Sequence, residues 1–325
     1  MPVITYLEAI QQGLREEMRR DAAVFLLGED IGVYGGAFKV TKGLFDEFGA
    51  ARVIDTPISE AAIIGASVGA AVRGLRPVAE MQFSDFITDG FNETVNIAAT
   101  TYFRWHIPVP MVVRMPSGAG ISGGPSHSRN PEVWFAHQPG LKIVCPATAY
   151  DAKGLLKSAI RDNNPVLYFE HKNLYRRIKD EVPEEEYLIP IGKAKISREG
   201  QDATIIAYGA AVHYAIDAAN KISTDTGKSV EVIDLRSLVP LDVEAIITSV
   251  RKTGRVLITH EDNLTAGFGA EIAALISDNA FAYLDAPIKR VAAKDIPVPF
   301  AHALEQFTLP DSQRIETTLR ELLIF

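Results

Sequence analysis

The sequence has a single cysteine, no apolar run long enough to span a bilayer and no excess of positive charge. The lone thiol, Cys145, excludes an intrachain disulfide and, within the apolar run 141–145, is expected in a core. The N-terminal residues lack the basic and apolar regions of a signal sequence. A formal net charge of −8 argues against an extended nucleic-acid surface. These absences favour a cytoplasmic protein that binds neither membranes nor nucleic acids.

The chain alternates predicted strands and helices over most of its 325 residues, of which 47% are hydrophobic and 23% charged. Such alternation predicts an α/β fold with parallel sheets covered on both faces, built as two domains. The amino-acid composition changes at residues 176–186, which are highly charged and contain a proline. We therefore expect a first domain at residues 1–180, a linker at 181–200 and a second domain at 201–325.

The chain is organised around residues 55–60 (DTPISE) and the small-residue run at 61–71. Residues 53–54 are typical of the end of a buried strand, Pro57 breaks the extended segment, and Ser59 is a suitable helix cap. Glu60 then falls in the first turn of the following helix, where the helix dipole favours a carboxylate. A capping glutamate would satisfy this pattern without any catalytic role.

Three glycine-containing segments resemble functional motifs. Residues 65–69 (GASVG) match the nucleophile elbow of serine hydrolases, but they lie inside a predicted helix, so Ser67 is expected to pack. Residues 118–123 (GAGISG) match a dinucleotide fingerprint, but no helix begins within the motif, and an irregular loop is expected instead. The loop at 28–36 follows a strand and is either a ligand-facing loop or a tight turn.

Several segments, in order along nearly the whole chain, resemble the beta subunit of the decarboxylating component of 2-oxo acid dehydrogenase complexes, a transketolase-like, thiamine-diphosphate-dependent family. They include residues 28–32 (GEDIG), 55–60 (DTPISE), 74–77 (GLRP), 127–128 (HS), 139–142 (PGLK), 150–156 (YDAKGLL), 190–194 (PIGKA) and 252–255 (KTGR). The resemblance implies a pyrimidine-binding domain followed by a smaller transketolase C-terminal-like domain.

The resemblance also implies roles for individual residues. Glu60 aligns with the glutamate that hydrogen-bonds the aminopyrimidine ring of the cofactor, a task that needs a protonated carboxyl in a dry pocket. Phe86 matches the aromatic residue that packs on this ring, Gln82 a neighbouring polar contact, and Ile58 a residue that lines the cofactor. His127 matches the histidine near the reacting carbon, where it is suited to proton transfer or to the dihydrolipoyl-transfer step.

A structural potassium site is implied as well. It maps onto backbone and side-chain oxygens near one helix end, namely those of Met111, Ala159, Ile160, Asp162 and Asn164. A plain helix end without an ion is the alternative interpretation.

Two sequence features differ from those of the family. Residues 102–108 replace a Gly-Gly pair found in many relatives, and no Gly-Asp-Gly motif for magnesium and diphosphate is present.

The function implied by the resemblance is that of a beta subunit in an α2β2 heterotetramer. It would decarboxylate pyruvate or a branched-chain 2-oxo acid with thiamine diphosphate and reductively acylate the lipoyl group of the acyltransferase core. The alpha subunit would hold the diphosphate and Mg²⁺. An acetoin dehydrogenase beta subunit and a non-catalytic docking scaffold are alternatives, and a serine hydrolase or nicotinamide enzyme is a remote one.

Overall fold

The computed structural model describes residues 1–325 and divides into two compact units. Unit 1 contains residues 1–117 and 134–191, and unit 2 contains residues 118–133 and 192–325. The segment 118–133 therefore packs with the C-terminal unit although it lies well within the N-terminal half of the chain. The predicted limits at 1–180, 181–200 and 201–325 stay a prediction. None of the helices combines the length and the apolar character that crossing a membrane requires.

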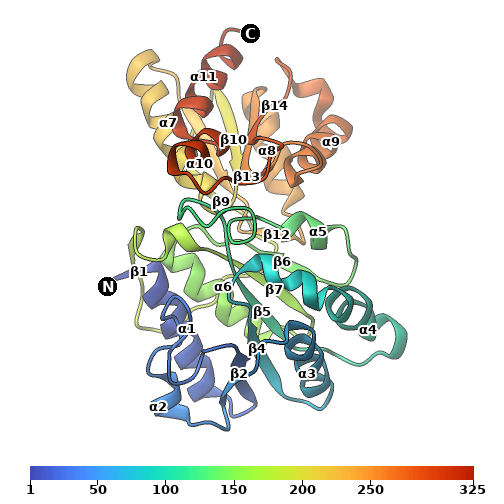
Figure 1. Ribbon diagram of the computed structural model, residues 1–325. Coiled ribbons are helices and arrows are strands. Elements are labelled where there is room, and N and C mark those ends of the chain that lie inside the picture. The colour runs from blue at the N-terminus through green and yellow to red at the C-terminus, as the bar shows by residue number, and fades with distance from the viewer. The chain divides into compact units, whose positions relative to one another are not determined.

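Unit 1 is built around parallel strands in the order β6-β7-β5-β4-β2-β3 (Figure 1). These strands are Lys142–Val144 (β6), Val166–His171 (β7), Val112–Ser117 (β5), Arg76–Glu80 (β4), Val24–Gly28 (β2) and Val53–Asp55 (β3). Strands β5 and β7 are buried along their whole length, as expected for a parallel sheet covered on both faces. A separate antiparallel pair joins Val3–Thr5 (β1) to Lys179–Glu181 (β8).

The helices of unit 1 begin where the sequence supplies caps and apolar stripes. Thr5 and Glu8 form a capping box at the start of α1 (Tyr6–Arg20), and Leu7, Ile10, Leu14 and Met18 form its buried stripe. This helix packs against α6 (Ala149–Arg161). The other helices are α2 (Leu44–Phe48), α3 (Glu60–Val72), α4 (Ala99–Trp105), α5 (Glu132–Ala136), whose first residues belong to unit 2, and the short η3 (Lys172–Leu174).

Two predictions about helices in unit 1 were wrong in detail. The sequence predicts a single helix at about residues 88–102, but the structure has a 3₁₀ turn (η1, Ser84–Gly90), a π turn (η2, Glu93–Ala98) and then α4. The Thr94 hydroxyl donates to the Gly90 carbonyl at 2.9 Å, a local bond that competes with regular helix. Ser59 occupies the N-cap position of α3 but its side chain makes no capping hydrogen bond.

Unit 2 is a second α/β sheet, in the order β14-β13-β10-β11-β9. Its strands are Lys289–Ala293 (β14), Val256–Asn263 (β13), Ala203–Ala207 (β10), Val230–Asp234 (β11) and Lys195–Arg198 (β9), and only β9 is antiparallel. Helices α7 (Ala211–Thr226) and α11 (Ser312–Leu322) pack together, as do α8 (Val243–Thr253) and α9 (Phe268–Ala280) (Figure 1). The remaining elements are β12 (Ser237–Val239), η4 (Phe281–Tyr283) and α10 (His302–Thr308).

The predicted fold class is confirmed, with the antiparallel edge strand β9 as the one addition to the second sheet. Two predictions about misleading motifs also hold. Ser67 is buried inside α3 and its hydroxyl donates to the Ile63 carbonyl, so it packs rather than reacts. No helix begins within residues 118–123. Cys145 is buried and forms no disulfide, as expected.

Candidate active site

The carboxyl ends of three neighbouring strands of unit 1 gather most of the predicted site. Gly28 at the end of β2 is in register with Asp55 at the end of β3 and with Glu80 at the end of β4. The Thr56 amide donates to the Gly28 carbonyl at 3.0 Å, which ties the segment 56–59 to the loop after β2. Ligands of open α/β sheets bind outside the carboxyl ends of strands. This edge is therefore where a ligand of unit 1 is expected.

Glu60 opens α3 directly above the end of β3. Its side chain is half-buried and has no hydrogen-bond or ion-pair partner in the chain. A second carboxylate, Glu29, is buried in the adjacent loop after β2. Burial and then the charges of Glu60 and Asp30 raise the pKa of Glu29. Two carboxylates without a cationic partner thus share this edge, and the charge of Glu60 disfavours ionisation of Glu29.

The other three predicted cofactor residues lie on the same edge. Ile58 is 82% exposed in the segment between β3 and α3. The Gln82 amide, just after β4, donates to Asp30 at 3.4 Å. Phe86 is half-buried in η1 and meets Phe83 edge to face, with ring centroids 5.7 Å apart. A flat heteroaromatic ring would find here an aromatic face, a polar contact and an unpaired carboxyl, so the residues fit a pyrimidine ring.

Sequence reasoning missed a buried ion network beneath this edge. The Arg114 guanidinium bridges Glu170 and Glu80, with its Nε 2.5 Å from a Glu170 oxygen, and the Tyr175 hydroxyl donates to Glu170 at 2.7 Å. All three charged side chains are buried on adjacent strands, Arg114 within β5, Glu170 near the end of β7 and Glu80 at the end of β4. The sequence carried a signal for this network, because the predicted strands at 77–81, 109–115 and 166–170 each contain one charged residue at or near their end. The network satisfies those charges internally and gives the edge a rigid base.

His127 lies in unit 2, in the loop formed by residues 118–133. Its ring is half-buried and its Nδ1 lies 3.2 Å from the Ser126 hydroxyl. That contact constrains the tautomer and orientation of the imidazole. The histidine is therefore held by a local partner in a glycine-rich loop, as a residue suited to proton transfer would need to be.

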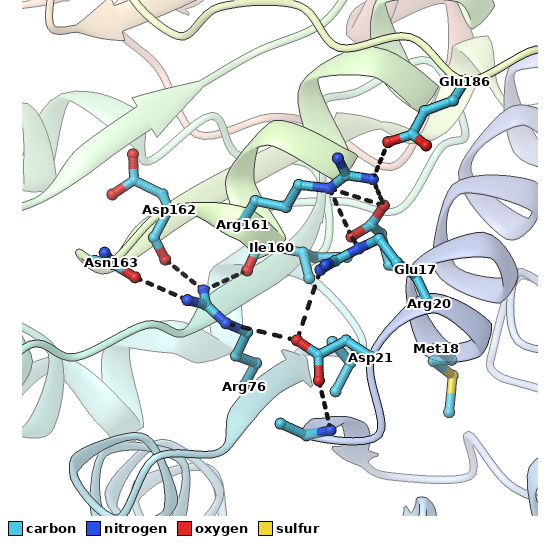
Figure 2. A network of polar contacts seen from close by, with 12 residues as sticks. Glu17, Met18, Arg20, Asp21, Arg76, Ile160, Arg161, Asp162, Asn163 and Glu186 are labelled. Atoms are coloured by element: carbon cyan, nitrogen blue, oxygen red, sulfur yellow. Dashed lines mark hydrogen bonds and ion pairs between the residues drawn. The ribbon is translucent and has the colours of Figure 1, made fainter.

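The predicted cation ligands lie at the opposite, amino edge of the unit 1 sheet. Met111 precedes β5, and the other four follow one another from the end of α6 to the start of β7. Figure 2 shows the Arg76 guanidinium among them, donating to the carbonyls of Ile160 at 2.9 Å and Asp162 at 3.0 Å. It also donates to the Asn163 side chain at 2.8 Å.

The remaining oxygens of the set also have partners within the chain. The Met111 carbonyl accepts from the Val166 amide at 3.0 Å, and the Asp162 carboxylate pairs with Lys142 and accepts from the Asn164 amide. A carbonyl has two lone pairs, so these oxygens keep capacity for a monovalent cation. No three His, Cys, Asp or Glu side chains are grouped to hold a metal. A cation here would therefore depend on backbone oxygens and would face two protein cations.

Unit 2 contains a second group of acids that the sequence did not reveal. Glu132 is buried and accepts from the Tyr208 hydroxyl at 2.9 Å, while its other carboxylate oxygen has no partner. Burial, followed by the charges of Asp262 and Glu261, raises the pKa of Glu132 to about 8. Burial likewise raises the pKa of Asp262 to about 7. Both acids therefore favour the protonated form more strongly than an exposed carboxyl does.

Comparison with known proteins gives consistent matches along the chain. The family described as transketolase, pyrimidine binding domain matches residues 3–178, and transketolase, C-terminal domain matches residues 192–315. The chain is 50% identical to the 2-oxoisovalerate dehydrogenase subunit beta of Bacillus subtilis over 100% of both chains. It is 47% identical to the pyruvate dehydrogenase E1 component subunit beta of Staphylococcus epidermidis, over 97% of each chain.

A solved structure supports the same fold. The split gene transketolase, described as an inactive beta4 tetramer, matches with a TM-score of 0.81 at 22% sequence identity. The match covers 99% of this chain and 98% of that chain. At this identity the likeness establishes the transketolase-like fold of both units.

Proposed function

We propose a function from one premise: the chain belongs to the beta subunits of the thiamine-dependent decarboxylating components of 2-oxo acid dehydrogenases. With an alpha subunit it carries out the oxidative decarboxylation of a 2-oxo acid and the reductive acylation of a lipoyl group. The observation that carries the proposal is the half-buried, unpaired Glu60 on one sheet edge with Ile58, Gln82 and Phe86. A docking scaffold would have no need of such a carboxyl.

Each residue of this edge has a defined task in the proposal. When bound, thiamine diphosphate supplies an electron sink for decarboxylation of the 2-oxo acid. Glu60 holds a proton on its carboxyl and donates it in a hydrogen bond to the ring nitrogen of the pyrimidine. Phe86 packs on the ring face, Gln82 contacts its polar edge and Ile58 excludes water from it.

His127 is proposed to act in acyl transfer to the lipoyl group. Its imidazole is oriented by Ser126 and is carried by a loop rather than by a regular element. Loops placed by a rigid scaffold commonly carry catalytic groups. Proton transfer by a positioned imidazole at neutral pH matches the needs of thiol and carbonyl chemistry at this step.

The alpha subunit is proposed to cover apolar surface on unit 1 and to hold the diphosphate and Mg²⁺. Helix α3 exposes small residues at Ala62, Ala66 and Gly69, which allow close backbone approach. Helix α4 exposes Tyr102, Phe103 and Trp105 by 52%, 87% and 52% of their surfaces. A monomer rarely exposes adjacent aromatic residues to this extent, which favours a protein partner.

The acyltransferase core is proposed to dock on unit 2. A cavity of about 810 Å³ near α9 and η4 is lined by residues that include Phe281, Leu284, Ala286 and Phe325. The net charge of −8 favours a basic partner through electrostatic complementarity. Replacing Phe281 and Phe325 by Ala should weaken co-sedimentation with the core and leave decarboxylation in solution unchanged. Unchanged co-sedimentation would contradict this docking site.

The test of the main proposal is reconstitution. The chain and its alpha partner are assayed with pyruvate, 2-oxoisovalerate and acetoin, because relatives at 50% and 47% identity carry different substrates in their names. Calorimetry follows thiamine diphosphate and magnesium binding to the chain before and after the alpha subunit is added. We expect no activity and no micromolar binding for the chain alone. A chain that binds or turns over by itself would overturn the proposed division of the site.

A further inference from the structure

The loop that carries His127 belongs to unit 2 and is closed by a hydrogen bond of its own backbone. The Gly118 amide donates to the Arg129 carbonyl at 3.0 Å, so residues 118–129 form a closed turn. His127 lies two residues before the closing carbonyl. Any group that fixes the first half of this turn therefore limits the motion of the histidine.

The main group that fixes the turn is the carboxylate of Glu305, on the short helix α10. This side chain is fully buried, with 0% of its surface exposed. Its Oε1 accepts from the Gly120 amide at 2.9 Å and from the Ser122 amide at 3.1 Å. Its Oε2 accepts from the Ser122 amide at 3.1 Å and lies 3.5 Å from the Ser122 hydroxyl.

A second buried carboxylate continues the pattern. Glu261, near the end of β13, accepts from the Ala119 amide at 2.6 Å. Gly118 and Gly120 have φ values of +85° and +87°, a region that glycine enters without strain. Successive amides that converge in this way form an anion-binding concavity. The backbone amides of the glycine-rich segment 118–123, which resembles a dinucleotide fingerprint, thus donate to two carboxylates of the same chain.

The held turn is packed directly against the histidine. A side chain at Gly123 would place its Cβ 3.0 Å from the Cβ of His127 and 2.9 Å from the Ser128 hydroxyl oxygen. Gly124, with φ +72°, lies so close to Phe300 that a Cβ would be 2.2 Å from the ring. The His127 amide donates back to the Gly124 carbonyl at 3.4 Å. Displacement of residues 119–122 would therefore move the histidine.

We infer that Glu305, together with Glu261, is a positioning residue for His127, because their carboxylates hold the amides of the loop that carries it. The inference rests on the proposed role of His127 in acyl transfer. Neither acid needs to touch substrate or cofactor. Charge-assisted hydrogen bonds to backbone amides are short and strong, which suits them to this role.

The first test follows the loop itself, in the reconstituted assembly of the chain and its alpha partner. Glu305→Gln keeps the size of the side chain but turns one acceptor into an amide donor that faces the loop amides. Hydrogen exchange of residues 118–129 should become about tenfold faster or more, and with Glu261→Gln by a smaller factor. Glu271→Gln, which removes an exposed acid of the same unit, should leave exchange unchanged. Unchanged exchange in Glu305→Gln would overturn the inference.

The second test separates positioning from mere stability. Glu305→Gln should lower the rate of lipoyl acylation about tenfold, with decarboxylation measured by an artificial electron acceptor changed less than twofold. Glu305→Asp keeps the charge and should fall between wild type and Glu305→Gln, which guards against a folding defect. In the double variant with His127→Ala, loss of Glu305 should add nothing further. Faster loop exchange with normal acylation, while His127→Ala is impaired, would contradict positioning.

The two proposals fail in different ways. If His127→Ala itself acylates lipoyl domains normally, the proposed role of the histidine falls, and with it the positioning role of Glu305. Hydrogen exchange alone then tests whether the hydrogen bonds of Glu305 restrict the motion of the loop. An equal loss of decarboxylation and acylation in Glu305→Gln would indicate general destabilisation and would also overturn the inference.

Discussion

At the carboxyl edge of the unit 1 sheet, Glu60 has no hydrogen-bond partner in the chain, whereas Glu305 in unit 2 accepts from the amides of Gly120 and Ser122. Both are glutamates near the start of a helix and both approach a glycine-containing loop. The difference lies in what their oxygens contact. The chain satisfies Glu305 completely, and it leaves Glu60 to be satisfied by something else.

This contrast separates acids that have partners in the chain from Glu60, which in the proposed function binds the cofactor. The carboxylate of Glu305 is already occupied by backbone amides, whereas a carboxylate without a partner in the chain keeps its oxygens available to another molecule. Asp162 at the amino edge belongs with the structural acids, since it pairs with Lys142 and accepts from Asn164. Substitutions should therefore divide into those that change activity and those that change stability.

The largest effect is expected for Glu60→Gln. The variant should fold with unchanged thermal stability, because no partner in the chain is lost, and acylation of lipoyl domains should fall by about 10²–10⁴-fold, as for other positioned acid–base groups. Glu244→Gln, an exposed first-turn glutamate of α8, is the matched control and should keep full activity. Activity within a few-fold of wild type in Glu60→Gln would place Glu60 with the structural acids.

Whether a feature of the fold or the site could be predicted from the sequence depends on how far apart along the chain the interacting residues lie. Helix α1 could be predicted because its cap and its stripe, Leu7 to Met18, are local patterns. The Glu60 position could also be predicted, since a strand end, a proline and a small-residue run are contiguous. The catalytic role proposed for Glu60 comes from the resemblance to a family and not from periodicity.

The Glu305 and Glu261 contacts could not be predicted in the same way. Ala119 and Glu261 are 142 residues apart, and Gly120 and Glu305 are 185 residues apart. A carboxylate that accepts hydrogen bonds from backbone amides produces no sequence signal at the donor residues, because every residue except proline has a backbone N–H. Glycine marks only the backbone geometry, which is why residues 118–123 resembled a nucleotide-binding loop.

A second prediction concerns pH and Glu132. Its pKa in the folded state, about 8, lies above the ordinary value of 4.5, so the folded state retains a proton that the unfolded chain has lost. The stability that this acid contributes is therefore complete below about pH 4.5 and declines as pH rises toward 8, by up to about 1.4 kcal/mol per pH unit. Asp262, with a pKa of about 7, acts in the same direction.

Glu132→Gln imitates the protonated acid and should remove part of this decline. Urea unfolding at pH 6, 7, 8 and 9 should show wild type losing about 1–3 kcal/mol over the series, and the variant losing less. The amide oxygen can still accept from Tyr208, so the variant should be similar to wild type near pH 4.5 and more stable than wild type from pH 6 upward. Parallel pH curves for the two proteins would show that Glu132 is ionised at neutral pH.

A third prediction concerns the amino edge. Arg76→Lys retains the charge but cannot donate at once to the Ile160 and Asp162 carbonyls and the Asn163 side chain. We expect a loss of about 1–2 kcal/mol in the free energy of unfolding, with activity at permissive temperature within twofold of wild type. Arg73→Lys, at the exposed C-cap of α3, is the control. A large loss of activity without destabilisation would remove the distinction between the two edges.

The smallest effect is expected from potassium at that amino edge. We propose that K⁺ binds the carbonyls of Met111, Ala159 and Ile160 with Asp162 and Asn164, through lone pairs that the chain leaves unused. Arg76 and Lys142 already place positive charge beside these oxygens, so binding should be weak.

A ligand that binds only the folded state stabilises it by mass action, and K⁺ at 100 times its Kd would add about 2.7 kcal/mol. Weak binding makes the expected gain a rise in Tm of about 1–3 °C in potassium chloride over tetramethylammonium chloride at equal ionic strength. Asp162→Asn should remove the difference between the two salts, and equal Tm values for wild type in both would exclude the ion from this site.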